Sequence, residues 1–183
     1  SDVYKRQALG LLSGCAGMST GSRAHVVVVG GGYGGATTAK YLRMWSEGKI
    51  RVTLVEPNPS FISCPLSNLV VGGSKTLADI TSSYDKLSAV HGVEMVRDRV
   101  VAIDAGRQSV RLAGGAVLSY DRLVVSPGID FMWDALPGMA KAGAKESVLH
   151  AWKAGPQTRN LQGQLRAMPD GGVYALSIPP APY

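Results

Sequence analysis

Three groups able to do chemistry stand near the start of this chain: closely spaced glycines, one carboxylate and one thiol. The glycines form the pattern G-x-G-x-x-G at Gly30, Gly32 and Gly35. At this spacing they permit a tight turn, a close approach of backbone to a pyrophosphate, and close packing of a helix on a strand. The amides and the positive dipole end of that helix bind phosphate groups. The pattern therefore predicts a site for the diphosphate of a dinucleotide.

The carboxylate is that of Glu56, which follows the last glycine by about twenty residues. An acid at this distance accepts hydrogen bonds from the ribose hydroxyls of an adenosine. The alternative interpretation is a glycine-rich hairpin followed by an exposed acid. Because that alternative requires strand, glycines, helix and acid to coincide by chance, we favour the dinucleotide site.

The thiol is that of Cys64, and Cys15 is the only other cysteine of the sequence. Pro65 follows directly, and proline is favoured in the first turn of a helix, so Cys64 is predicted at a helix N-terminus. It comes eight residues after Glu56, within chain reach of the isoalloxazine ring of a bound flavin. Three interpretations stay open: a covalent flavin tether, a redox-active cysteine facing the flavin, and an inert buried cysteine.

Strands and a helix must hold these groups in place. An unbroken β-branched run at 25–29 predicts a strand buried on both faces of a parallel sheet. A helix is predicted over 36–45 and a second strand over 50–56. The succession of strand, glycine turn, helix, strand and acid is that of a βαβ dinucleotide-binding unit.

Further elements are predicted downstream of this unit. The bend Ser126-Pro127-Gly128 either brings the backbone close to the cofactor or is a plain loop. Before that bend we predict a return to the parallel sheet at 123–125. The remaining predictions are a helix over 76–91, a strand over 93–96, and an antiparallel meander of short strands at 100–102, 110–112 and 116–118.

The last part of the sequence has the pattern of a second dinucleotide-type domain at its beginning. A helix is predicted over 156–168 and a strand over 171–178. The run Pro179–Pro182 then takes the place of phosphate-binding glycines, and proline supplies neither the turn nor the N–H donors. We therefore expect no nicotinamide dinucleotide there. The expected fold class is α/β, with a Rossmann-like domain at 24–155 and a truncated second domain at 156–183.

The first residues are interpreted separately from the fold. Residues 1–7 can be back-translated into the transposase mosaic end used in sequencing-library preparation, so we interpret them as adapter-derived. Residues 8–23 have the pattern of an export-signal remnant and spacer. Leu12–Cys15 resembles a bacterial lipobox, although an ordinary or twin-arginine signal with an incidental cysteine fits as well. We expect a periplasmic protein whose membrane contact is at most a lipid anchor at Cys15.

Composition narrows the function classes. A chain of 183 residues with 45% apolar content can build one sizeable core. The formal net charge of +6 comes without a Lys/Arg cluster, so no nucleic-acid partner is indicated. The spacing of His25, His91 and His150 suits no metal site, and we interpret all three as structural. Trp133 and Trp152 either cover a flavin face or fill the core or a domain seam.

Several segments together resemble the flavoprotein subunit of flavocytochrome c sulfide dehydrogenase. They are Val26–Tyr41, Glu56-Pro57-Asn58, Cys64–Asn68, Gly72-Gly73, Tyr120–Ile129 and His150–Gly155. The resemblance implies an FAD cofactor joined to Cys64 through an 8α thioether. It also implies a small inorganic sulfur substrate, sulfide, and a c-type cytochrome subunit that accepts the electrons.

The resemblance also assigns roles within the chain. The redox cysteine pair of that family has no counterpart in this sequence, and its first member is expected beyond Tyr183. We therefore assign no catalytic residue here and expect this polypeptide alone not to oxidise sulfide. Two alternatives are a sulfide:quinone oxidoreductase-like flavoprotein and a non-catalytic nucleotide-binding module. The residues expected to contact FAD are Gly30, Gly32, Tyr33, Gly34, Gly35, Glu56, Pro57, Asn58, Cys64, Ser126, Pro127 and Gly128.

Overall fold

The computed structural model describes residues 23–177, which form two compact units. Unit 1 contains the described residues up to Pro57 together with Leu87–Pro127. Unit 2 contains Asn58–Lys86 together with the described residues from Gly128 onward. Each unit is therefore built from two separate stretches of the chain. Among the described residues, no helix has the length and apolar character needed to cross a bilayer.

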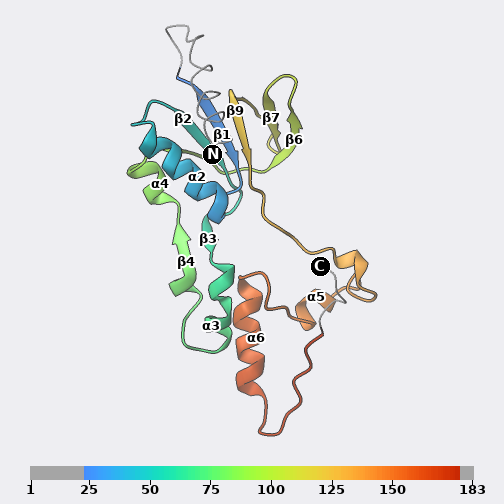
Figure 1. The fold of residues 1–183 in the computed structure, drawn as a ribbon. Helices are drawn as coiled ribbons and strands as arrows, with labels where there is room; N and C mark the ends of the chain where they lie inside the picture. Colours follow the sequence, from blue (N-terminus) through green and yellow to red (C-terminus); the bar gives the residue numbers. More distant parts are fainter. Residues whose placement is uncertain (1–22, 178–183) are drawn as a thin grey trace, which may run out of the picture. The chain divides into compact units, whose positions relative to one another are not determined.

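Unit 1 contains a four-stranded parallel sheet with the strand order β5-β2-β1-β9. The side chains of Val27, Val28, Val52 and Leu54 are fully buried, as expected for β-branched and leucine residues in a sheet covered on both faces. Helix α2 (Tyr33–Trp45) packs against the two central strands (Figure 1). The strands are β1 (His25–Val29), β2 (Arg51–Val55), β5 (Glu94–Val96) and β9 (Arg122–Val125).

These elements confirm the predicted βαβ order with small shifts at their ends. Helix α2 begins at Tyr33, earlier than the expected residue 36, because the glycine turn itself enters the helix. Its C-terminal end is held by Arg43, whose guanidinium donates hydrogen bonds to the carbonyl oxygens of Gly48, Ile50 and His91. The predicted α/β fold class with a parallel sheet is confirmed.

A small antiparallel sheet completes unit 1, as predicted. Val110 and Leu112 of its central strand are buried in one apolar cluster with Val27 and Val55 of the parallel sheet. This shared core fixes the meander to the sheet. Its strands, in the order β6-β7-β8, are β6 (Val100–Asp104), β7 (Ser109–Leu112) and β8 (Val117–Ser119).

Unit 2 consists of a two-stranded antiparallel sheet and short helices. Strand β3 (Ser60–Ile62) pairs with β4 (Thr81–Ser83). Helix α3 (Ser67–Val71) packs against the longer helix α6 (Pro156–Ala167), as Figure 1 shows. The other elements are η2 (Cys64–Leu66), η3 (Ala78–Ile80), η4 (Trp133–Ala135) and α5 (Ala144–Ser147), while α4 (Asp85–Ala89) spans the boundary between the units.

The prediction of a helix over 76–91 was wrong. The chain forms η3, strand β4 and the short α4 instead. Strand β4 pairs residue by residue with β3, for example Ser82 with Phe61, and this pairing uses backbone groups that a continuous helix would need. Upstream, the Asp79 carboxylate accepts hydrogen bonds from the backbone amide and hydroxyl of Thr76, a local turn that starts η3.

The strand predicted over 171–178 is not formed in residues 171–177. Val173 and Leu176 are 92% and 71% exposed. A parallel strand is stabilised by hydrogen bonds to neighbours on its edges, and this segment pairs with none of the described strands. The predictions for residues 1–22, including Cys15, and for Pro179–Pro182 lie outside the described residues.

Candidate cofactor site

The glycine turn lies at the carboxyl end of β1, directly against the segment that follows β9. Gly30 has a φ of +93°, and its amide donates a hydrogen bond to the Val55 carbonyl at 2.9 Å. A Cβ added to Gly30 would lie 2.0 Å from the carbonyl oxygen of Ser126. Only glycine satisfies both the positive φ and this close backbone approach.

The next glycines hold helix α2 close to the turn. A Cβ on Gly35 would lie 1.8 Å from the Gly30 carbonyl oxygen, and one on Gly34 would lie 2.8 Å from the Ser126 hydroxyl. The Ser126 amide donates to the Val29 carbonyl at 2.8 Å. The structure thus brings Ser126 and the adjoining Pro127 to the turn, two of the residues that the sequence analysis singled out.

Glu56 is fastened to the glycine turn. It follows β2, is 7% exposed, and its Oε2 accepts a hydrogen bond from the Gly31 amide at 2.7 Å. The sequence predicts that this carboxylate binds ribose, and the bond to the Gly31 amide is an additional contact that only the structure shows. Since a carboxylate offers about four acceptor positions, this bond is compatible with additional donors from a ligand.

The N-terminus of α2 has the features of a phosphate site. The residue before the helix is Gly32, and no side chain caps this end. The first turn contains no acidic residue, so nothing in it opposes an anion. Tyr33 is 57% exposed at the start of the helix. A helix start without a side-chain cap behind a glycine turn is an arrangement whose backbone amides bind phosphate groups, and the diphosphate site stays a prediction.

The other predicted cofactor contacts are at the surface or beyond the turn. Pro57 and Asn58 are exposed, directly after Glu56. Gly128 has a φ of +76°, and a Cβ added to it would meet no atom within 4 Å. The tight approach therefore ends before Gly128, which needs its glycine for conformation alone.

Cys64 lies at the start of η2, as Pro65 predicted, and is a half-buried free cysteine. Its Sγ donates a hydrogen bond to the carbonyl oxygen of Trp152. The amide of the preceding residue, Ser63, donates to the carbonyl of Ile80, the last residue of η3, at 2.9 Å. The thiol is thus held in a defined place within unit 2 and is not enclosed in a core.

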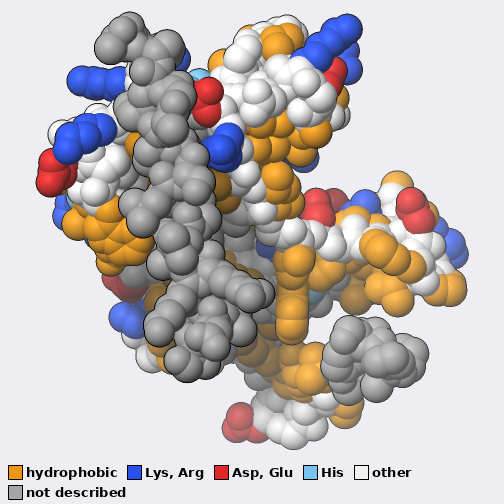
Figure 2. Space-filling view, turned by 45° about the horizontal axis from the view of Figure 1, so that its top comes forward, with side chains coloured by type: hydrophobic (Ala, Val, Ile, Leu, Met, Phe, Trp, Pro, Cys, Tyr) orange, Lys and Arg blue, Asp and Glu red, His pale blue; other side chains and the backbone are white. Residues whose placement is uncertain are grey.

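Three aromatic rings of unit 2, those of Phe131, Trp133 and His150, lie against one another. The centroid of the Phe131 ring lies 4.4 Å from that of His150 and 4.7 Å from that of Trp133, and the ring planes are tilted by 42° and 41°. Burial is the main cause that lowers the pKa of His150, with the nearby Lys153 charge adding to it. The Trp152 side chain is 64% exposed, so it fills no core. Figure 2 shows apolar side chains exposed beside charged ones on the visible face.

A small cavity adjoins these rings in unit 2. Its volume is about 40 Å³, which admits a water-sized group and no flavin or quinone. Lys153 and Asp130 form an ion pair of 3.0 Å in its wall. Its other lining residues are Ile129, Phe131 and Trp152.

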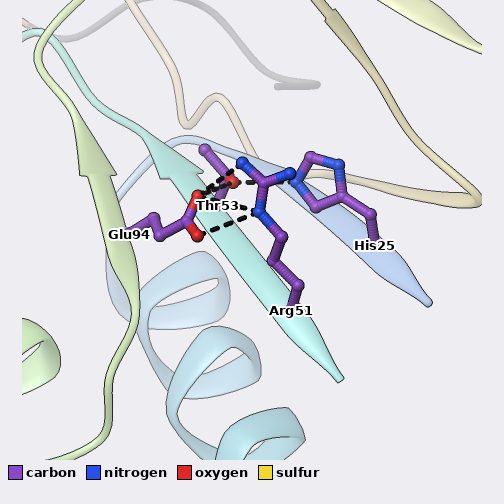
Figure 3. Close-up of polar contacts among 4 residues, drawn as sticks. All are labelled: His25, Arg51, Thr53 and Glu94. Atoms are coloured by element: carbon purple, nitrogen blue, oxygen red, sulfur yellow. Dashed lines mark hydrogen bonds and ion pairs between the residues drawn. The ribbon is translucent and has the colours of Figure 1, made fainter. Parts of the chain in front are cut away.

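A second polar cluster, which was not predicted from the sequence, lies at the amino ends of the parallel strands (Figure 3). The Arg51 guanidinium donates to the Glu94 carboxylate at 2.8 Å, and Thr53 links that carboxylate to the His25 ring. The hydrogen bond from Arg51 lowers the pKa of Glu94. Burial, followed by the Arg51 charge, lowers the pKa of His25.

This cluster joins strands β1, β2 and β5 and has no metal-binding character. Within residues 23–177 no three His, Cys, Asp or Glu side chains lie close enough together to hold a metal ion. The signal for the cluster was strand register, which pairs residue 25 with 51 and residue 53 with 94. Register of this kind becomes visible only once the strand order is known.

The fold and the glycine turn define a dinucleotide-binding protein of the Rossmann type. The chain belongs to the pyridine nucleotide-disulphide oxidoreductase family, whose model matches residues 24–164. Membership of this family implies FAD as the cofactor. The glycine turn, the N-terminus of α2 without a side-chain cap, and Glu56 are features that bind such a dinucleotide.

Two relatives of known function are similar to this chain in sequence. The chain is 64% identical over 45 residues to the sulfide dehydrogenase (flavocytochrome c) flavoprotein chain of Chlorobaculum thiosulfatiphilum, covering 25% of this chain and 92% of that sequence. It is 27% identical over 154 residues to the mitochondrial sulfide:quinone oxidoreductase of Dictyostelium discoideum, covering 84% of this chain and 34% of the relative. The chain thus spans about a third of the length of that oxidoreductase.

Solved structures agree with this placement. The sulfide:quinone oxidoreductase of Aquifex aeolicus superposes with a TM-score of 0.67 at 26% identity, covering 78% of this chain and 32% of that one. Putidaredoxin reductase, in its covalent complex with putidaredoxin, gives a TM-score of 0.64 at 26% identity, covering 82% and 36%. Both likenesses support the same α/β fold.

Proposed function

We propose that this chain is the FAD-binding part of a flavoprotein that oxidises sulfide and passes the electrons to a c-type cytochrome subunit. The observation that carries the proposal is the 64% identity to the flavocytochrome c sulfide dehydrogenase flavoprotein chain. The glycine turn and the Glu56 carboxylate give that similarity a physical basis, since both are built to hold an adenine dinucleotide.

In this proposal unit 1 binds the nucleotide half of the cofactor. The backbone amides at the start of α2 hold the diphosphate, and the missing side chains of the glycines let it approach. The Glu56 carboxylate, already fixed by the Gly31 amide, accepts the ribose hydroxyls. When bound, FAD supplies a two-electron acceptor that can release its electrons singly.

We further propose that Cys64 ties the cofactor covalently. Its sulfur bonds to the 8α carbon of the flavin, the thiol and the methyl group each lose a hydrogen, and the corresponding electron pair leaves through the cofactor to dioxygen or the cytochrome. A thioether at this position prevents loss of the cofactor outside the cell and raises its oxidising power. The free, half-buried thiol at a fixed helix start supports this role.

The covalent bond has a direct test. The protein is expressed with FAD, denatured, separated on a gel and viewed for flavin fluorescence. We expect a fluorescent band in the wild type that disappears in Cys64→Ala. The matched control is Cys15→Ala, the other cysteine of the chain, which should keep the fluorescence. Fluorescence that survives in Cys64→Ala would overturn the tether.

The rival within the same class is a sulfide:quinone oxidoreductase-like flavoprotein. The match to the Dictyostelium discoideum sulfide:quinone oxidoreductase, which extends over 84% of this chain, favours it. Under that rival, FAD is extracted by denaturation and the full-length protein reduces a quinone with sulfide. A non-catalytic nucleotide-binding module would bind FAD and reduce neither acceptor.

For the location we propose export to the periplasm with a lipid anchor at Cys15. The motif Leu12–Cys15 supports it. Growth with a labelled fatty acid should label the wild-type protein and leave Cys15→Ala unlabelled. Unlabelled protein in the periplasmic fraction would instead indicate an ordinary export signal.

A further inference from the structure

The side chain of Ser67 lies between the backbone of Cys64 and a segment distant in sequence. Ser67 is the first residue of α3 and only 4% exposed. Its hydroxyl lies 2.7 Å from the Cys64 carbonyl oxygen and 3.3 Å from that of Ala151. A hydroxyl has one hydrogen to donate, so it is shared between the two acceptors with the nearer one favoured.

The thiol contacts the same distant segment one residue further along. Cys64 Sγ donates to the Trp152 carbonyl oxygen, directly after the Ala151 carbonyl that Ser67 reaches. Two consecutive carbonyls therefore receive the hydroxyl and the thiol of one short helical turn. A single side chain, Ser67, touches both the backbone that carries the thiol and the backbone that the thiol faces.

Helix α6 fixes the acceptor segment. The Gly155 amide donates to the Thr158 hydroxyl at 3.1 Å, and Thr158 is fully buried. On the next turn Gln162 Nε2 donates to the Val70 carbonyl of α3 at 2.5 Å. The carbonyls that receive the hydroxyl and the thiol thus belong to a segment anchored on the helix that also packs on α3.

From this geometry we propose that Ser67 is the positioning residue for the Cys64 sulfur. Its hydroxyl holds the turn so that the thiol keeps one direction, toward the Trp152 carbonyl, until it bonds to the cofactor. The inference rests on the proposed function. In the bonding step the carbon–sulfur bond forms, the thiol and methyl hydrogens leave, and their electron pair passes through FAD to dioxygen or the cytochrome. Ser67 exchanges no electrons or protons.

The test compares rates of covalent attachment in the full chain. Apoprotein with Cys15→Ala is mixed with FAD, and flavin fluorescence of the denatured band is followed over time. We expect Ser67→Ala to attach FAD about tenfold more slowly, because loss of one buried hydrogen bond and of the aligned thiol slows bond formation. Ser67→Thr keeps the hydroxyl and should restore the rate.

A second readout needs no cofactor. In the Cys15→Ala background, maleimide should react faster with Cys64 when Ser67→Ala is added, because the thiol is no longer held on the Trp152 carbonyl. The matched control is Ser74→Ala, which removes another hydroxyl-to-carbonyl bond, 3.2 Å to Leu69, at the far end of α3. It should change neither rate.

The outcomes separate the two proposals. Wild-type protein without covalent flavin overturns the tether and this inference together. Normal attachment in both the wild type and Ser67→Ala overturns the positioning role and leaves the tether intact. If Ser67→Ala does not fold, Ser67→Thr decides: attachment at the wild-type rate supports the inference, and loss of attachment overturns it.

Discussion

The glycine turn of unit 1 and the Cys64 turn of unit 2 are built on different principles. At the glycine turn, backbone lies against backbone, and the sequence must omit side chains at Gly30 and Gly35 for that to happen. At the Cys64 turn, side chains of Cys64 and Ser67 reach out to carbonyls at positions 151 and 152. One site is specified by absent atoms and the other by hydrogen bonds.

The difference has consequences for how each region tolerates change. A backbone contact that leaves no room for a side chain is broken when a carbon is added. A segment held by hydrogen bonds loses only the free energy of one bond when one partner is removed. Substitutions in the glycine turn should therefore have larger effects than substitutions around Cys64.

Gly30→Ala should have the largest effect. The new Cβ would meet the Ser126 carbonyl oxygen at 2.0 Å, and alanine would have to adopt a φ of +93°. We expect a loss of about 1–2 kcal/mol for the backbone conformation and about 1–3 kcal/mol for the clash. Urea unfolding of the apoprotein measures the loss, and FAD binding should fail in parallel.

Gly115→Ala is the matched control in the same unit. Its φ is +90°, but a Cβ there would meet nothing within 4 Å. It should lose only the conformational part, about 1–2 kcal/mol, and keep FAD. Equal losses in the two variants would show that the approach of Ser126 to the turn has no energetic weight.

Glu56→Ala should have the next largest effect, since it leaves the buried Gly31 amide without its charged acceptor. The expected cost is about 1.5–3 kcal/mol in urea unfolding, with weaker FAD binding. Glu56→Gln keeps a neutral acceptor and should fall between Glu56→Ala and the wild type. If glutamine equals alanine in stability, the bond to Gly31 does not hold the turn.

The sequence predicted the glycine turn and the parallel sheet because their signals are local. Glycine spacing and the valine run of β1 determine the geometry within a few residues. The Cys64 turn was predicted only in part: Pro65 indicated a helix start, but nothing indicated that Trp152 would face the thiol. A contact across 88 positions leaves no local pattern.

The same reasoning explains the wrong helix over 76–91. Residues 81–83 carry no strong strand pattern, and they form β4 because Ser60–Ile62 offers them a partner. The Glu94–Arg51 cluster also could not be predicted from the sequence, since it depends on which strands become neighbours. Local chemistry was predictable from sequence; pairing between distant segments was not.

Thr158→Val tests the support behind the Cys64 turn. Valine has nearly the same shape but removes the acceptor of the Gly155 amide at the start of α6. We expect a loss of about 1 kcal/mol in urea unfolding, as for a lost helix-cap bond. Thr158→Ser keeps the hydroxyl and should lose less. A valine variant as stable as the wild type would remove Thr158 from this support.

The amino-end cluster should give the smallest effect, a pH dependence. The pKa of Glu94, lowered by its bond to Arg51, and that of His25, lowered by burial, both lie below their unfolded values. Each therefore contributes stability above its unfolded pKa that is lost as pH falls through its folded pKa. Because Arg51 and Glu94 are half exposed, their pair contributes roughly 0–1 kcal/mol.

The sharper measurement concerns His25, which faces Arg51, Thr53, Glu94 and the Asp121 carboxylate bound to its own amide. In the wild type, protonation of the ring in the unfolded state should lower the melting temperature as pH falls below 6.5. His25→Gln has no proton to bind and should melt with a flatter dependence on pH between about 5 and 7. Glu94→Gln should flatten the curve only at lower pH. If the dependence of the melting temperature on pH is the same in His25→Gln and the wild type, burial at this strand end does not disfavour the charged ring. The cluster would then be no more than a surface ion pair beside a neutral histidine.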